Sequence, residues 1–330
     1  MMAGLLEVSN LEVQFTSRNG VVRAVNGVDY AIDEGEIMAL VGESGSGKSI
    51  TALTLLGLVP KPTGKIANGQ ILFNGTDLAL KSEKEYRQIR GQEIAMIFQN
   101  PLTAMDPSFT IGNQMIEVIR DRQGLSKATA LREAKSLLEL VGIHDQERVL
   151  NSYPHALSGG MRQRVMIAIA LSCKPKLLIA DEPTTALDAT IQLQILALLK
   201  KINKELKTTI IFITHDFGVV ANLCDKVAVM YAGRIVEYGE TSALLKNPQH
   251  PYTIGLMQAM PELNGNADQK RLNQIEGSPP DLLNLPAGCS FYDRCKIATS
   301  LCRDSFPKAT ITGEHIVRCF QREDERNELN

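Results

Sequence analysis

Hydrophobic and polar positions divide this chain into short apolar segments that alternate with amphipathic ones. Residues 6–15 and 21–32 are rich in β-branched residues and are separated by the turn sequence Ser-Arg-Asn-Gly, which predicts two β-strands. The short apolar runs at 37–41, 177–180 and 210–214 have the pattern of strands buried in a parallel sheet.

Helical spacing lies between these apolar runs. Residues 49–58, which end before Pro-Lys-Pro, and residues 112–142, clearest at 128–141, are predicted to be helical. Between the last two predicted strands, apolar residues recur at helical spacing, and we interpret them as core packing: Ile191, Ile195, Leu198, Ile202 and Leu206. Buried strands that alternate with helices indicate an α/β architecture with a largely parallel sheet.

Composition narrows the functional classes. The 330 residues are 44% apolar, which is enough for a proper core. A net charge of −2 offers no bulk attraction to nucleic acid or to an anionic membrane. No apolar run approaches the roughly 18 residues of a membrane span, and the N-terminus lacks the pattern of a secretory signal. Any membrane role is therefore expected to be peripheral, through a protein partner.

A phosphate-binding loop is the strongest motif. Gly42-Glu-Ser-Gly-Ser-Gly47-Lys48-Ser49 matches G-x-x-x-x-G-K-[ST] between a predicted strand and a predicted helix. Lys48 would reach the β- and γ-phosphates, and the Ser49 hydroxyl would bind Mg²⁺. A flexible glycine loop is the alternative, but the pattern arises by chance in roughly one chain per hundred. The predicted nucleotide contacts in this region are Gly42, Ser44, Gly45, Gly47, Lys48, Ser49 and Ile50.

An acidic pair follows a second buried strand. Leu177-Leu-Ile-Ala ends in Asp181 and Glu182. Asp181 is predicted to lie near Mg²⁺, usually through water, and Glu182 to polarise an attacking water. Acidic pairs after apolar strands also occur as simple caps. Together with the phosphate loop, the pair favours nucleotide hydrolysis.

A third motif opens a helical run. Leu157-Ser158-Gly159-Gly160-Met-Arg-Gln-Arg precedes the apolar residues 165–171. Ser158 could be an ordinary helix cap, while a second exposed helix N-terminus suggests another anion contact. This octet resembles the signature motif of ATP-binding cassette (ABC) ATPases.

Further pieces of that family's pattern occur in order. Gln99 resembles the Q-loop glutamine, Ala186-Leu187-Asp188 the D-loop, and His215 the switch histidine. Phe15 stands where the family places an aromatic residue that stacks on adenine, although a strand phenylalanine is more often part of the core. Taken singly, each of these residues would be unremarkable.

The resemblance covers about residues 5–255 and implies a fold. We expect a P-loop NTPase cassette in residues 1–258, with a mainly parallel sheet, an N-terminal antiparallel β region and a helical subdomain at about 100–165. It also implies that ATP is bound between two facing cassettes. Ser158, Gly159, Gly160 and Asp188 would contribute to the partner's nucleotide. Glu182 would act as general base, His215 would hold the γ-phosphate and water, and Gln99 would bind Mg²⁺ and link the site to a transmembrane partner.

The C-terminal part, residues 259–330, is predicted to be a separate loop-rich extension. It contains few regular apolar patterns, and a unit of this size commonly needs a staple. Four of the chain's six cysteines lie there, namely Cys289, Cys295, Cys302 and Cys319. Cytosolic thiols are kept reduced, so a metal is favoured over disulfides.

The cysteine spacing bears on the identity of the metal. The intervals C-x5-C, C-x6-C and C-x16-C lack the tight knuckles of structural zinc sites. Iron–sulfur clusters accept four thiolates from more widely spaced loops. We therefore favour a [4Fe–4S] cluster, followed by zinc and then by thiols without metal. In a zinc site, His315 could replace one thiolate.

The same extension also carries a family resemblance. The pieces that carry it are His250-Pro-Tyr-Thr, Leu256, Pro261, Gly-Ser-Pro-Pro and Gly288-Cys-Ser-Phe-Tyr-Asp-Arg-Cys. They resemble the C-terminal extension of dipeptide/oligopeptide (and nickel) ABC importers, in the first of their two paired ATPase subunits. The resemblance implies an ATP- and Mg²⁺-dependent subunit that powers peptide import at the cytoplasmic face of the bacterial membrane. Its expected partners are a second ATPase subunit, a paralogue, together with two transmembrane permease subunits and, indirectly, an extracytoplasmic peptide-binding protein.

Other functions stay open at this stage. The same branch includes nickel importers. A soluble ABC ATPase of translation or DNA repair normally has two cassettes in one chain or a long coiled-coil insertion; neither is visible here, and the lack of a basic patch argues against nucleic acid as a partner. An iron–sulfur regulator that uses ATP only for switching is disfavoured by the intact Glu182 and His215.

Overall fold

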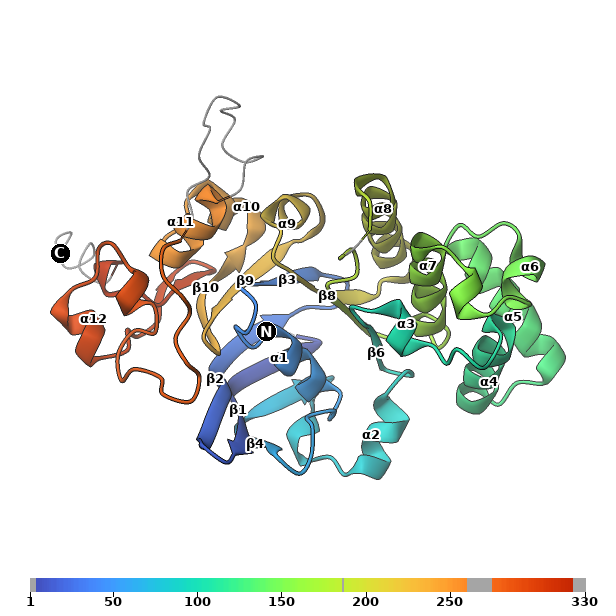
Figure 1. Ribbon diagram of the computed structural model, residues 1–330, viewed down its shortest axis with the longest axis horizontal. Coiled ribbons are helices and arrows are strands. Elements are labelled where there is room, and N and C mark those ends of the chain that lie inside the picture. Colours follow the sequence, from blue (N-terminus) through green and yellow to red (C-terminus); the bar gives the residue numbers. More distant parts are fainter. Residues whose placement is uncertain (1–3, 186, 260–274, 323–330) are drawn as a thin grey trace. The chain divides into compact units, whose positions relative to one another are not determined.

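The computed structural model describes residues 4–185, 187–259 and 275–322 (Figure 1). The chain forms two compact units. The first consists of Met1–Asp33, Ile37–Leu80 and Thr214–Asn330, and the second of Glu34–Glu36 and Lys81–Ile213. Each unit is described by itself.

The first unit begins with an antiparallel sheet. β1 (Leu6–Ser17) pairs with β2 (Gly20–Ile32) on one side and with β4 (Gly64–Phe73) on the other, and β4 pairs with the short β5 (Thr76–Asp77). Buried apolar residues from β1, such as Leu6, Leu11 and Val13, contribute to the core. The predicted hairpin and N-terminal antiparallel region are confirmed.

A second sheet of the first unit carries the phosphate loop at one strand end. β3 (Ile37–Val41) is parallel to β9 (Lys226–Tyr231), and β9 pairs antiparallel with β10 (Arg234–Glu240). The extension adds β12 (His315–Val317) to β10 and β11 (Thr310–Thr312) to β12. The helical elements of this unit are α1 (Lys48–Leu55), η1 (Leu78–Leu80), α9 (Phe217–Leu223), α10 (Thr241–Lys246), α11 (Pro251–Gln258), η3 (Tyr292–Arg294) and α12 (Ser300–Asp304).

The second unit contains a parallel sheet in which β7 (Leu177–Asp181) lies between β8 (Thr209–Thr214) and β6 (Ile94–Ile97). Every residue of β7 and β8 is buried, as the apolar runs at their centres predict. The helical elements of this unit are α2 (Glu83–Ile89), α3 (Pro101–Ala104), α4 (Ile111–Gln123), α5 (Lys127–Leu140), α6 (Gln146–Leu150), η2 (Pro154–Ala156), α7 (Gly159–Ala170) and α8 (Ala189–Leu206).

The helices α4 to α7 gather into one helical cluster (Figure 1), and the helical subdomain at about 100–165 stays a prediction. The segment 112–142, predicted as helical throughout, is divided into two helices. Gly124 ends α4 with φ +66°, and Ser126 caps α5 by accepting a hydrogen bond from Thr129 N–H. A left-handed glycine followed by a capping serine is the usual way to stop one helix and start the next.

Within the described residues, no helix combines the length and the apolar character needed to cross a membrane. The domain bounds 1–258 and 259–330 stay predictions. Ala186 of the predicted D-loop and Pro261 of the C-terminal pattern lie outside the described residues.

Candidate nucleotide site and cysteine pocket

The phosphate loop runs from the end of β3 into α1. Gly47 is the N-cap of α1 with φ +104°, and a Cβ there would overlap the Ala24 carbonyl oxygen and lie 2.8 Å from Met230 Cε. A Cβ at Gly42 would overlap the Met230 carbonyl oxygen. The loop therefore follows a path past neighbouring backbone that only glycine permits at these positions.

Lys48 is buried at the start of α1. Its Nζ donates hydrogen bonds to the carbonyl oxygens of Gly42 at 2.7 Å and Glu43 at 2.9 Å. Ser49 and Ile50 lie in the first turn of the same helix. A lysine ammonium beside a glycine loop and a helix N-terminus is an arrangement that binds phosphate groups.

The aromatic residue expected at the adenine lies in the first unit as well. Phe15 is on β1 and half-buried. A Cβ at Gly64 would lie 2.6 Å from Phe15 Cε1, so the ring packs directly on this glycine of β4. The ring thus has partial exposure, which a stacking residue needs.

The acidic pair lies at the end of β7 in the second unit. Asp181 is buried, and Glu182 follows with φ +44°, an uncommon value for a residue with a side chain. The Glu182 carboxylate accepts hydrogen bonds from Gln99 Nε2 and from Thr185 Oγ1, each at 3.0 Å. The structure therefore brings together the predicted base and the predicted Q-loop glutamine, and it adds Thr185, which sequence reasoning missed.

The signature motif and the D-loop also meet within the second unit. Ser158 is the exposed N-cap of α7 and accepts a hydrogen bond from Met161 N–H, while Gly159 and Gly160 form the first turn. A Cβ at Gly160 would lie 2.8 Å from Ile191 Cγ2, so α7 closely approaches the start of α8. Asp188 caps α8 by accepting a hydrogen bond from Ile191 N–H.

His215 is an exposed residue of the first unit, between β8 and α9. The next residue, Asp216, fixes the start of α9 by accepting hydrogen bonds from Gly218 N–H at 2.8 Å and Val219 N–H at 3.3 Å. Each unit thus holds part of the predicted catalytic set. Their joint action on one nucleotide stays a prediction.

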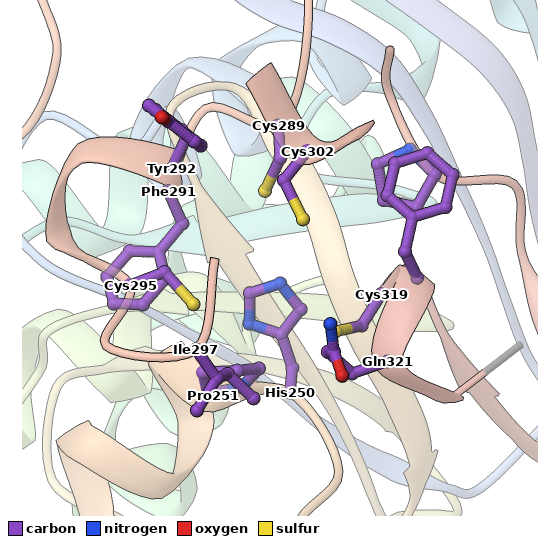
Figure 2. Close-up of a pocket in the computed structure, with 12 residues that line it drawn as sticks. His250, Pro251, Cys289, Phe291, Tyr292, Cys295, Ile297, Cys302, Cys319 and Gln321 are labelled. Carbon is purple, nitrogen blue, oxygen red and sulfur yellow. The ribbon is translucent and has the colours of Figure 1, made fainter. Parts of the chain in front are cut away.

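The four clustered cysteines line one pocket in the first unit (Figure 2). His250 also lines this pocket. All four thiols are free. In the part of the chain that the structure describes, no three His, Cys, Asp or Glu side chains are placed to hold a metal ion, so the predicted metal site is not confirmed. His315, considered above as a zinc ligand, instead lies 2.8 Å from Glu237 Oε1.

The electrostatics of the pocket oppose free thiolates. Burial raises the pKa of Cys289 and of Cys319 to about 11, and it also raises the pKa of Cys295. The smaller opposing effect comes from backbone N–H groups that hydrogen-bond each sulfur from two residues further along, at Phe291, Ile297 and Gln321. These thiols are therefore neutral near pH 7 unless a cation compensates them.

His250 joins this pocket to the cassette, a role that the sequence did not suggest. It is 1% exposed, and its Nδ1 accepts a hydrogen bond from Tyr252 N–H at 3.1 Å. Burial lowers its pKa to about 4, so the ring is neutral. The sequence signal was its position directly before Pro251, where a side chain can cap a helix.

Comparison with known proteins places this geometry in a family. The sequence profile of the family described as "ABC transporter" matches residues 25–185, and the profile "Oligopeptide/dipeptide transporter, C-terminal region" matches residues 236–302. Among solved structures, the chain resembles the dimeric, post-hydrolysis ATP-binding cassette MJ0796 bound to ADP and Pi. That likeness has a TM-score of 0.64 and 27% identity and covers 72% of this chain and 98% of that one.

Curated relatives match nearly the whole chain. The oligopeptide transport ATP-binding protein OppD of Bacillus subtilis is 52% identical over 96% of this chain and 88% of its own length. The dipeptide transport ATP-binding protein DppD of the same organism is 48% identical over 97% of this chain and 95% of its own. OppD of Salmonella typhimurium is 46% identical over 96% of this chain and 93% of its own length. The chain therefore belongs to the ABC transporter family, among the oligopeptide and dipeptide transport ATP-binding proteins.

Proposed function

We propose that this chain is the ATP-hydrolysing subunit that powers import of dipeptides or oligopeptides across the bacterial cytoplasmic membrane. The observation that carries the proposal is the phosphate loop between β3 and α1, joined to a C-terminal region of the peptide-transporter type. The nucleotide chemistry follows from the loop. The cargo follows from the relatives, whose names specify oligopeptide or dipeptide transport.

The phosphate loop and Lys48 bind the β- and γ-phosphates of ATP, and Phe15 stacks on the adenine. Ser49, Asp181 and Gln99 would hold Mg²⁺, which supplies charge neutralisation at the phosphates. Asp181 is buried at a strand end. It therefore offers a carboxylate whose direction is fixed by the sheet.

Glu182 accepts a proton from the attacking water. Hydrogen bonds from Gln99 and Thr185 orient its carboxylate, which supports its role as general base. His215 holds the γ-phosphate and the water in line. Ser158, Gly159, Gly160 and Asp188 serve the nucleotide of a facing cassette, to which the exposed start of α7 is available.

Replacing Glu182 tests this assignment. Glu182→Gln keeps the size and removes the basic oxygen, so we expect ATPase activity to fall by about 100-fold or more while ATP binding persists. Glu205→Gln, an exposed glutamate on α8, is the control. The prediction for Glu182→Gln is checked by measuring kcat and equilibrium ATP binding of both variants. Full activity in Glu182→Gln would remove Glu182 from the mechanism.

The partners proposed are a second, paralogous ATPase subunit, two transmembrane permease subunits and, indirectly, an extracytoplasmic peptide-binding protein. The chain would then lie on the cytoplasmic face of the membrane, held there by the permease. Purification from detergent-solubilised membranes tests this. Two polytopic subunits and a second cassette should accompany the chain, whereas ribosomes or DNA would overturn the importer assignment.

We also propose that Cys289, Cys295, Cys302 and Cys319 bind a [4Fe–4S] cluster, with zinc as the alternative. Support comes from four free thiols on one pocket and from N–H groups directed at three of the sulfurs. A bound metal would supply the positive charge that stabilises thiolates against burial. Iron, sulfide and zinc analysis of anaerobically purified protein distinguishes the two metals, and the absence of all three would reject both.

A further inference from the structure

The extension reaches the phosphate loop through one arginine. Arg294 lies in η3, between Cys289 and Cys295, and its side chain is 5% exposed. Its Nη1 donates to Glu43 Oε2 at 2.7 Å and its Nη2 donates to Glu43 Oε1 at 3.0 Å. Glu43 is the second residue of the phosphate loop, so a fork-shaped ion pair joins the extension to the nucleotide-binding segment.

Both members of this pair are held by further contacts within the first unit. Arg294 also donates to the carbonyl oxygens of Glu276 at 3.0 Å and Ile275 at 3.3 Å, and to Tyr231 Oη at 3.3 Å. The Glu43 N–H donates to Tyr252 Oη at 2.9 Å. The pair is therefore fixed from both sides, and its geometry constrains the backbone of the loop.

A second part of the extension lies along the same loop. Pro279, Pro280 and Leu282 line one small pocket together with the residues Glu43–Ser46. The extension thus contacts the loop at a second place besides the Arg294–Glu43 pair.

The charges make a specific demand on Arg294. A carboxylate in a phosphate-binding loop repels the phosphates of ATP, and Glu43 carries such a carboxylate, while its backbone carbonyl accepts a hydrogen bond from Lys48 Nζ. A bidentate guanidinium cancels this negative charge and fixes its position. Without Arg294, the half-buried carboxylate would remain as an uncompensated anion next to the phosphate site.

We propose that Arg294 is a positioning residue for ATP binding, which acts through Glu43 to hold the phosphate loop and to neutralise its carboxylate. The extension thereby completes the nucleotide site from outside the cassette motifs. Arg294 acts on binding of ATP in the ground state, so its loss raises KM more than it lowers kcat.

A double-mutant series separates this role from simple loss of folding. In Arg294→Ala, the Kd for ATP, measured by titration of the purified full chain, should rise about tenfold, because the carboxylate of Glu43 is no longer neutralised. Arg294→Lys keeps the positive charge but loses the bidentate geometry, so its Kd for ATP should lie between those of the wild type and Arg294→Ala. In Glu43→Gln/Arg294→Ala no anion is left, so the double variant should bind ATP more tightly than Arg294→Ala alone.

Arg318→Ala is the matched control. Arg318 also lies in the extension and forms an ion pair with Asp29 at 2.9 Å, but within the described residues it has no hydrogen bond or ion pair with the phosphate loop. It should leave ATP binding unchanged. An Arg294→Ala protein that binds ATP like the wild type would overturn the proposal. So would a double variant that binds no better than Arg294→Ala, since a merely structural arginine predicts that result. If Arg294→Ala does not fold, ATP binding is compared between Arg294→Lys and Glu43→Gln/Arg294→Lys instead, and the double variant should again bind ATP more tightly than the single one.

Discussion

At the scale of single residues, the phosphate loop depends on glycines for two separate reasons. Gly45 has φ +78° but nothing within 4 Å of an added Cβ, whereas Gly47 combines φ +104° with close approach to Ala24 and Met230. The first position needs only conformational freedom. The second needs conformational freedom and space, so the two glycines should differ in their tolerance of a methyl group.

This difference predicts the outcome of a matched pair of substitutions. Gly47→Ala should weaken ATP binding by more than about tenfold, because the loop must move away from the Ala24 carbonyl and the backbone is strained as well. Gly45→Ala carries the strain alone and should weaken binding less. Equilibrium ATP binding of the two variants, with thermal unfolding as a folding check, measures the order. The reverse order would contradict the steric argument.

At the scale of elements, several helix starts in this chain are set by short polar side chains. Ser126, Asp188 and Asp216 each accept hydrogen bonds from backbone N–H groups in the first turn of α5, α8 and α9. These caps also decide where the functional residues lie. Asp216 follows the predicted switch histidine directly, so this cap lies next to His215 in the chain.

The cap of α9 can be tested by its effect on stability. Asp216→Ala leaves the N–H groups of Gly218 and Val219 without their acceptor and should destabilise the protein by roughly 1 kcal/mol. In thermal unfolding this corresponds to a decrease in Tm of a few degrees. Asp216→Asn retains a capping oxygen and should recover most of the loss. Equal Tm values for the alanine variant and the wild type would show that the cap contributes nothing.

At the scale of the whole molecule, the extension is stabilised by the cassette as well as by its own residues. Phe291 packs 5.3 Å from Tyr231 and 5.4 Å from Tyr252, measured between ring centroids. Glu237, fully buried on β10, accepts hydrogen bonds from His250 N–H and Gln249 N–H and lies 2.8 Å from His315 Nε2 on β12. The extension, whose sequence predicted too few apolar patterns for a core of its own, thus packs on the core of the cassette.

The cysteine pocket should nevertheless be needed for this docking. Cys289→Ala removes one predicted metal ligand near Phe291 and Arg294, so we expect loss of the metal, a protease-sensitive extension and a higher KM for ATP. Cys173→Ala, outside the pocket, is the control. Limited proteolysis, metal analysis and steady-state kinetics provide the three measurements. A Cys289→Ala protein with a protected extension and unchanged ATPase would refute the staple hypothesis.

The strands and most helices were predictable because their signals are local. Each signal predicts the structure of its own short segment, as do the unbroken apolar run at 37–41, a glycine pattern and a capping serine. The break at Gly124 was missed because helical periodicity continues on both sides of it, although Gly124 and Ser126 are themselves local signals for a helix end and a helix start. The resemblance to peptide-transporter ATPases was likewise readable from motifs, and the relatives confirm it.

Motif spacing was enough to identify an ATP-hydrolysing protein, because phosphate binding and hydrolysis need residues at set spacings around one strand end and one helix start. The effect of the extension on the nucleotide site, in contrast, follows only from the folded chain. Arg294 and Glu43 are 251 positions apart in the chain, and no local sequence pattern encodes a contact over such a separation. Ion pairs and ring contacts of this kind depend on how the chain folds back on itself, which periodicity and motif spacing do not record.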